Sequence, residues 1–187
     1  MHPLVLYTVG HSTREFSELV ALLQEQGVRR LVDVRTMPRS RHNPQFNRDR
    51  LAVELPAIGM EYHHFPELGG LRKPHKVSLV NAAWRNDSFR GFADYMQTDE
   101  FHHAMEQLMD WGKELPTAFM CAESVPWRCH RSLIADALEA QGAVVFHILD
   151  STHTQPHRMT PFAEVRDGLV TYPAAQLSLP VEDSAHD

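Results

Sequence analysis

Cysteine is scarce in this sequence, because Cys121 and Cys129 are the only two cysteines in 187 residues. Two cysteines cannot form the disulfide framework that holds small secreted domains together. Apolar runs are short as well, and none approaches the roughly 18 consecutive residues of a membrane-spanning helix. The first residues carry no basic leader of the kind that begins a signal peptide. We therefore expect a cytoplasmic protein with no membrane contact, in which both thiols are reduced.

Motifs for common cofactors are also missing. The chain has no glycine-rich Walker or dinucleotide fingerprint. A phosphatase loop of the form Cys-x5-Arg does not fit, since Arg128 lies seven positions after Cys121 and no glycine stands between them. The spacing of Cys121 and Cys129 is too wide for a standard zinc clip. We expect no cofactor and no bound metal, and we keep a metal site with Cys and His ligands as the second alternative.

Negative charge dominates overall, but one segment is basic. The net charge is −6, whereas residues 28–50 hold seven arginines and two aspartates and so carry +5, which leaves −11 for the rest of the chain. Duplex nucleic acid needs a broad basic face, so a nucleic-acid coat is not favoured. A local site for a small anion agrees with these numbers, and the plain alternative is a solvated loop rich in arginine.

Length and composition indicate one globular unit. A chain of 187 residues is long enough for one domain, and 43% apolar residues can supply its core. The apolar pattern is lost after Tyr172, where proline, serine and aspartate accumulate. We predict a single α/β domain over residues 1–173 and a poorly ordered tail over residues 174–187.

Short apolar segments alternate along the chain with segments of helical periodicity. The predicted strands are residues 4–9, 30–34, 60–65, 116–121 and 143–149. The predicted helices are residues 16–26, 48–57, 89–96, 101–112 and 129–141. Ser12 and Glu15 have the spacing of a capping box, and Asn47 is the expected cap of the second helix. This alternation predicts a mostly parallel sheet of about five strands with helices on both faces.

Sheets of this kind bind ligands in the crevice outside the carboxyl ends of their strands. Polar or turn-forming segments follow four of the predicted strands, at residues 10–12, 35–41, 64–70 and 121–123. We expect these segments to converge at one edge of the sheet and to form the functional site.

Cys121 and Cys129 frame a loop that leads into the helix predicted to begin near Cys129. The backbone N–H groups and the dipole of a helix start favour anions and lower the pKa of a nearby thiol. We therefore predict a nucleophilic or redox role for Cys121 or Cys129, with His11 or Glu123 as the proton carrier. The predicted substrate-binding residues are Ser12, Arg35, Ser40, Arg41, His64, His130 and Arg131. The plain alternative is that the cysteines are inert core residues and that Ser12 only caps a helix.

Several motifs, taken in chain order, resemble those of one family. They are Tyr7-Thr8-Val9-Gly10-His11-Ser12, then Asp33-Val34-Arg35 with Pro38, Ser40, Arg41, Pro44 and Phe46, then Tyr62, His64, Pro66 and Leu68-Gly69-Gly70, and last Cys121-Ala122-Glu123, Cys129-His130-Arg131 and His147-Ile148. On these residues the chain resembles the bacterial and archaeal family known as domain of unknown function 488. The resemblance implies a Rossmann-like α/β fold, a three-layer sandwich. It implies no activity, because none is assigned to the family.

Two functions from different classes fit this pattern. The favoured one is an enzyme that acts on an anionic, phosphate-bearing or nucleotide-like substrate by cysteine and histidine chemistry, in a cleft at the carboxyl ends of the strands. The alternative is a non-catalytic module that binds a nucleotide, an anion or a nucleic-acid end. In both cases the expected partner is a small anionic or nucleotide-like ligand, extended nucleic acid is not favoured, and assembly into a homo-oligomer stays open.

Overall fold

The computed structural model describes residues 2–74 and 79–174 of the chain. Its strands are β1 (Val5–Gly10), β2 (Arg30–Asp33), β3 (Glu61–His64), β4 (Thr117–Cys121), β5 (Val144–Ile148), β6 (Thr154–Pro156), β7 (Glu164–Arg166) and β8 (Leu169–Thr171). Its α-helices are α1 (Phe16–Glu25), α2 (Arg48–Ala57), α3 (Asp87–Tyr95), α4 (Asp99–Glu114) and α5 (Arg131–Ala140). Short 3-10 helices are η1 (Pro44–Phe46), η2 (Pro66–Leu68) and η3 (Pro126–Arg128). The predicted tail, from residue 175 onward, lies outside the described residues.

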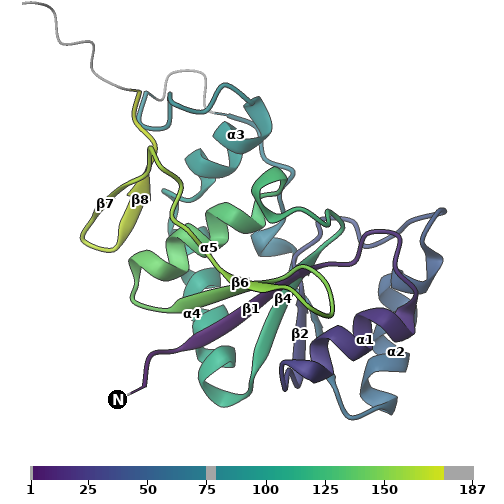
Figure 1. Cartoon of the computed structure of the whole chain (residues 1–187). Coiled ribbons are helices and arrows are strands. Elements are labelled where there is room, and N and C mark those ends of the chain that lie inside the picture. The colour runs from purple at the N-terminus through teal and green to yellow at the C-terminus, as the bar shows by residue number, and fades with distance from the viewer. Residues whose placement is uncertain (1, 75–78, 175–187) are drawn as a thin grey trace, which may run out of the picture.

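Six strands form one sheet in the order β3-β2-β4-β1-β5-β6, and β7 and β8 form a separate hairpin (Figure 1). The first five strands of this order run parallel, and β6 is antiparallel to its neighbour β5. The predicted Rossmann-like α/β fold with a mostly parallel sheet is therefore confirmed. The sequence pattern does not predict β6, because Thr154–Pro156 is three residues long and shows no apolar alternation.

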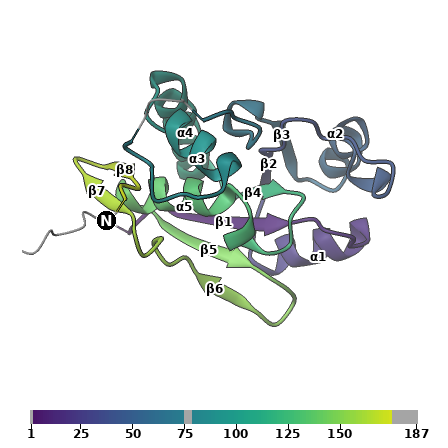
Figure 2. The same ribbon diagram turned by 90° about the horizontal axis from the view of Figure 1, so that it is seen from above.

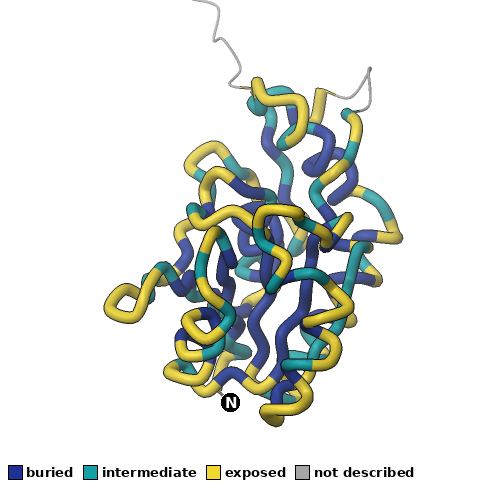
Figure 3. Tube along the Cα trace, turned by 90° about the vertical axis from the view of Figure 1, so that its right-hand side faces the viewer, coloured by how far each residue is buried: buried dark blue, intermediate teal, exposed yellow. Residues whose placement is uncertain are grey.

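Helices cover both faces of the sheet, and the strands lie buried between them (Figures 2 and 3). On one face, α1 and α2 bury leucines against Val9 and Leu31. On the other face, α3, α4 and α5 bury apolar side chains against Leu6 and Val32. Because successive residues of a strand point to opposite faces, Thr8 of β1 is directed toward the α5 side together with Leu6. No helix in the described part of the chain has the length and apolar character needed to cross a membrane.

β1 and β4 lie side by side in the middle of the sheet but lead in opposite directions. From β1 the chain passes through α1 to β2, whereas from β4 it passes through α5 to β5 on the other side of β1. The carboxyl ends of β1 and β4 thus form a topological switch point, where α/β sheets bind their ligands. Gly10 and Cys121, which are register partners, stand at this point.

The start of α1 differs from the prediction. Glu15, and not Ser12, precedes the first helical turn, and it makes no side-chain cap. Ser12 has a φ of 50°, whereas a capping residue takes an extended conformation. The chain turns sharply here because the N–H groups of His11 and Ser12 donate to the carbonyls of Cys121 and Ala122. The predicted capping box is therefore wrong.

α2 and α5 also begin differently from the prediction. Asn47 precedes α2 as expected, but its side chain accepts a hydrogen bond from the Ser40 N–H and none from the helix. α5 begins at Arg131 and not near Cys129, because η3 forms a separate turn and Cys129 is extended. This extended residue places the Cys129 side chain before the helix, where it can meet the end of β4.

Candidate functional site

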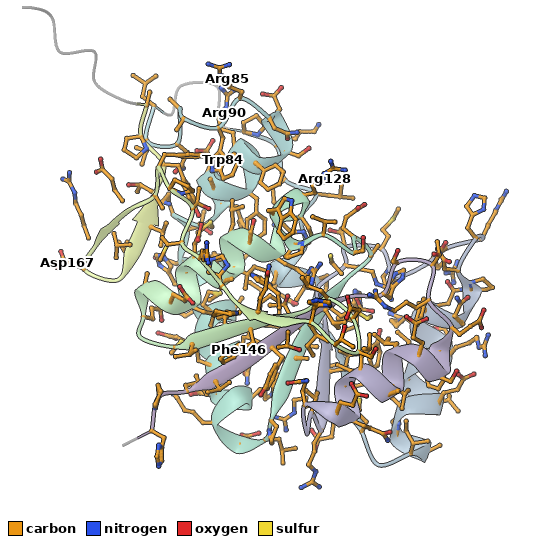
Figure 4. All side chains as sticks on the ribbon, viewed as in Figure 1. Trp84, Arg85, Arg90, Arg128, Phe146 and Asp167 are labelled. Atoms are coloured by element: carbon orange, nitrogen blue, oxygen red, sulfur yellow. The ribbon has the colours of Figure 1, made fainter. Side chains whose placement is uncertain are left out.

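A cavity of about 470 Å³ opens at the switch point, and both cysteines lie in its wall. Its wall includes Arg35, Cys121, Glu123, Arg128, Cys129 and His130, and we call it the thiol cavity. These residues come from the segment after β2, from the end of β4 and from the loop before α5. The Arg128 side chain extends outward from this loop (Figure 4).

The two cysteines are buried neighbours without a disulfide bond. Cys121 is the last residue of β4, Cys129 stands just before α5, and their Sγ atoms are 2.8 Å apart. Cys121 is 3% exposed and Cys129 is 5% exposed. Sulfur atoms this close share a hydrogen, so the pair titrates as one unit.

Arg131, the first residue of α5, lies next to the sulfur pair. Its Nε donates to the Cys121 Sγ at 2.9 Å, and its Nη1 donates to the Thr8 Oγ1 at 2.9 Å. Its Nη2 donates to the carbonyl of Glu123. Each corner of the guanidinium is therefore held, and one corner is directed at sulfur.

The charge of Arg131 has no carboxylate partner among the described residues, although the side chain is only 1% exposed. The other two buried arginines do have one: Arg35 pairs with Asp33 at 2.6 Å, and Arg30 pairs with Glu61 at 2.7 Å. A buried guanidinium without an anion carries a large desolvation penalty. Within the described part of the chain, the thiol pair is the ionisable group that Arg131 contacts directly, and this charge stabilises a thiolate over a neutral thiol.

The two thiols titrate unequally. Burial raises the pKa of Cys121, so this residue keeps its proton. The hydrogen bond from Cys121 lowers the pKa of Cys129 well below its usual value, and the nearby His130 and Arg131 lower it further. The Cys121 sulfur accepts from the guanidinium and lies 2.8 Å from the Cys129 sulfur. The lowered pKa of the pair is therefore on Cys129 and the raised pKa is on Cys121.

Arg35 is a second fixed cation at the thiol cavity. Its Nε and Nη2 donate to both carboxylate oxygens of Asp33 at 2.8 and 2.6 Å, and its Nη1 donates to the His11 Nε2 at 3.0 Å. The His11 Nδ1 donates to the carbonyl of Ser12, which fixes the neutral tautomer. Burial lowers the pKa of His11 to about 4, and its ring stacks on Phe46. His11 is therefore neutral at pH 7 and supports Arg35 from behind the cavity wall.

Two glycines permit the close approach of the segments that form this site. A Cβ atom at Gly10 would lie 1.8 Å from the backbone oxygen of Glu123, and one at Gly70 would lie 2.6 Å from the Nδ1 of His130. A side chain fits at neither position unless the loop after β4 or the His130 ring moves. Both glycines thus serve the assembly of the site.

A second cavity, of about 590 Å³, adjoins the thiol cavity, and we name it the arginine cavity. The two cavities share Thr36 and Met37 in their walls. Arg39, Arg48 and Arg50 also line the arginine cavity. Arg48 and Arg50 pair with neighbouring carboxylates, whereas Arg39 has no ion pair with any described residue. An anion larger than the thiol cavity would extend toward these cations.

The residues predicted for the site divide by position. Five of them line the thiol cavity, namely Arg35, Cys121, Glu123, Cys129 and His130. Arg131 and His11 contact residues of this wall. His64 borders the arginine cavity, where its Nε2 donates to the carbonyl of Arg35. The remaining three, Ser12, Ser40 and Arg41, line neither cavity. The roles predicted for all of these residues stay predictions.

Sequence reasoning assigned no role to a set of polar residues behind the thiol cavity. They are Thr8, Asp136, His147 and His157. Thr8 and His147 lie buried in the neighbouring strands β1 and β5, and their side chains are 2.8 Å apart. The available signal was a threonine and a histidine inside otherwise apolar strands, because a buried polar side chain needs a partner.

Among residues 2–74 and 79–174, no three side chains of histidine, cysteine, aspartate or glutamate are arranged to hold a metal ion. The Nδ1 of His130 lies 3.4 Å from the Cys129 Sγ, where it contacts the sulfur itself. The geometry of the described residues therefore gives no support to the alternative of a Cys/His metal site.

Residues 15–138 match a family whose description is "Domain of unknown function DUF488". The match covers more than half of the chain and includes both thiols, Arg35 and Arg131. No curated protein and no solved structure matches the chain.

Proposed function

The chain belongs to the DUF488 family, and because this membership assigns no activity, we propose one from the site: an enzyme that attacks a small anionic substrate with a cysteine thiolate in the thiol cavity. The observation that carries the proposal is Arg131, which is 1% exposed and directs its Nε at the Cys121 sulfur 2.9 Å away. A buried cation balanced by sulfur stabilises the nucleophilic form of the thiol pair.

Cys129 is the member of the thiol pair that reacts in this proposal. The Cys129 thiolate is the nucleophile, because its pKa is lowered and it lines the cavity. Its sulfur bonds to the electrophilic atom while the leaving group departs with the electron pair of the broken bond. Glu123 and His130, which line the same cavity, are the candidates that supply a proton to the leaving group. Since this chemistry needs reduced thiols, we place the protein in the cytoplasm.

The substrate is a phosphate-bearing or nucleotide-like anion in this proposal. Arg128 is exposed at the cavity wall and makes no ion pair with any described residue, so its charge is available to a ligand. Arg35 also lines this cavity, buried and held in place by its ion pair with Asp33. The start of α5 contributes the partial positive charge of its N–H groups.

The arginine cavity favours a second candidate, a non-catalytic module that binds a nucleotide or a related anion. Arg39, Arg48 and Arg50 line this cavity, and no cysteine is among its lining residues. Such a module would need these cations and Arg128 but no reactive sulfur. The two candidates therefore differ in whether the cysteines are required.

The test combines protection of the thiols with a search for turnover. Phosphate monoesters and nucleotides are added singly, and the rate at which iodoacetamide alkylates Cys129 is measured for each. A substrate is expected to slow this alkylation, and acid-quenched samples should carry a covalent adduct on Cys129 by mass spectrometry. Cys129→Ser should bind the same compound without turning it over.

Two outcomes would count against the enzyme. Turnover that survives in Cys129→Ser would remove the nucleophile, and binding without any turnover in the unaltered protein would favour the binding module. If none of the compounds protects Cys129, the proposed substrate class is wrong for the enzyme.

A further inference from the structure

A series of buried hydrogen bonds leads from Arg131 away from the thiol cavity. The Nη1 of Arg131 is 2.9 Å from the Thr8 Oγ1, which is 2.8 Å from the Nδ1 of His147. The Nε2 of His147 is 2.9 Å from the Nδ1 of His157, whose Nε2 is 2.8 Å from the Oδ1 of Asp136. All five side chains are buried, with exposed fractions of 9% or less. We name Thr8, His147, His157 and Asp136 the relay.

Asp136 ends the relay with all of its donors in place. Besides His157, the hydroxyl of Tyr172 donates to this carboxylate at 2.7 Å and the N–H of Thr160 donates at 3.0 Å. These donors come from three segments of the chain, one of them next to β8. Three donors satisfy a buried carboxylate, so the end of the relay is fixed.

The two ends of the relay fix the directions of the hydrogen bonds at Arg131 and at Asp136, and we infer the directions of the two bonds between them. A guanidinium only donates, so the Thr8 hydroxyl accepts from Arg131 and gives its own hydrogen to the His147 Nδ1. His147 then donates from Nε2 to His157, and His157 donates from Nε2 to Asp136. The His147 ring is neutral in this arrangement. Burial, which lowers the pKa of His147 to about 3, favours the same neutral form.

The orientation of the Arg131 guanidinium depends on the Thr8 hydroxyl. Its other two corners rest on the Glu123 carbonyl, which belongs to a loop, and on the Cys121 sulfur, which is a weak acceptor. Thr8 is the anchor on the sheet. Replacing buried polar side chains with apolar ones of the same shape often leaves the stability of a protein unchanged or raises it. Stability alone therefore does not account for the polar residues of the relay.

We propose that the relay is a positioning device, which holds the Arg131 guanidinium so that its Nε stays on the Cys121 sulfur and which thereby sets the reactivity of the thiol pair. This inference rests on the proposed function in one respect, that the thiol pair is the reacting group. No member of the relay lines the thiol cavity. The four residues are therefore positioning residues for the thiol cavity, although His147 and His157 line a separate cavity of about 550 Å³.

The test removes one hydroxyl and measures thiol chemistry. Thr8→Val keeps the shape of the side chain but leaves Nη1 of Arg131 unpaired and free to rotate. Alkylation of Cys129 by iodoacetamide at pH 7 should slow about tenfold, and the midpoint of its pH profile should rise by about one unit, as expected for a lost hydrogen bond to a charged group. Thr8→Ser, which keeps the hydroxyl, should restore most of the rate.

Thr117→Val is the matched control. Thr117 is 0% exposed, lies on the neighbouring strand β4 and donates to the carbonyls of Leu115 and Trp111 at the other end of the sheet. The substitution Thr117→Val should lower the free energy of unfolding without moving the pH midpoint of Cys129 alkylation. Equal midpoints in Thr8→Val and Thr117→Val would overturn the positioning role. If no substrate is found, a slower alkylation of Cys129 in Thr8→Val would still support the relay. The result of this test is therefore independent of the result of the enzyme test.

A second measurement uses the unaltered protein and does not depend on the folding of a variant. Methyl methanethiosulfonate blocks the thiols and removes the sulfur charge that Arg131 faces. The ring nitrogen signals of His147 should then shift in the nitrogen-15 NMR spectrum, because the hydrogen bonds from Cys121 to His147 are continuous. The ring nitrogen signals of His102 on α4 serve as the reference. If the ring nitrogen signals of His147 do not shift relative to them, the result counts against the relay.

Discussion

The Nε of Arg131 donates a hydrogen bond of 2.9 Å to the Sγ of Cys121, so a buried cation faces sulfur where other buried arginines face carboxylate. This contact connects stability with reactivity. If the thiol pair is fully protonated, Arg131 contacts no anion directly. The fold therefore favours the ionised pair, and a reaction that consumes the thiolate changes the balance of charge inside the protein.

Replacing Arg131 with methionine should raise the pKa of the thiol pair. An opposite charge at this distance lowers the pKa of a partner by about 1–3 units, and Arg131→Met removes it. The pH profile of alkylation by iodoacetamide measures the change. Arg30→Met is the matched control, because Arg30 is also buried but pairs with Glu61 and Glu114 at the other end of β2. An unchanged profile in Arg131→Met would mean that the arginine does not set the thiol pKa.

Mild oxidation should join Cys121 and Cys129 in a disulfide. Their sulfurs are 2.8 Å apart, and Cys129, whose pKa is lowered, can attack the peroxide to give a sulfenic acid from which the Cys121 sulfur then displaces the oxygen. One equivalent of hydrogen peroxide accepts two electrons as its O–O bond breaks, the S–S bond forms, and water and hydroxide leave. Both thiols should resist alkylation together and return together after reduction. Sulfinic acid on one cysteine, with the other still free, would contradict this prediction.

Gly10→Ala should destabilise the fold at the switch point. The new Cβ would lie 1.8 Å from the Glu123 oxygen, and relief requires movement of backbone. We expect a loss of at least about 1–3 kcal/mol in the free energy of unfolding, which is typical of overpacked sites. Urea denaturation measures it. Gly112→Ala is the comparison, since its contacts are the flexible ends of Leu6 and Leu4 and alanine suits a helix. Equal losses in the two variants would contradict the close approach at Gly10.

The folded protein should lose stability as the pH falls from about 6.5 to about 4 because of His11. Its pKa is about 4 in the folded state against 6.5 for an ordinary histidine, so the unfolded chain binds the proton first. The contribution is complete above pH 6.5 and declines through this window. His11→Gln keeps one donor and one acceptor but does not titrate. Between pH 7 and pH 5 it should lose about 2 kcal/mol less than the unaltered protein, by urea denaturation at both pH values. An equal loss would mean that His11 is not buried as a neutral ring.

Local patterns determined most of the architecture. Most of the parallel strands and α-helices follow from the apolar period of their own residues, which is a property of neighbours in sequence, whereas β3 (Glu61–His64) is mostly polar. The placement of Arg35 and Cys121 in one cavity wall also follows, since parallel strands end at the same edge. β6 was not predicted from the sequence, because its pairing with β5 depends on its position at the sheet edge and not on an apolar pattern.

The tertiary structure alone decided which polar side chains became partners. Thr8 and Arg131 are 123 residues apart, and nothing near either one in the sequence shows that they meet. The sequence by itself supplied two thiols, a cluster of arginines and an alternating α/β pattern. Only the packing of α5 on the sheet turned Arg131 inward, away from any carboxylate of the described residues and onto sulfur, because strand order and helix position fix which buried charge faces which acceptor.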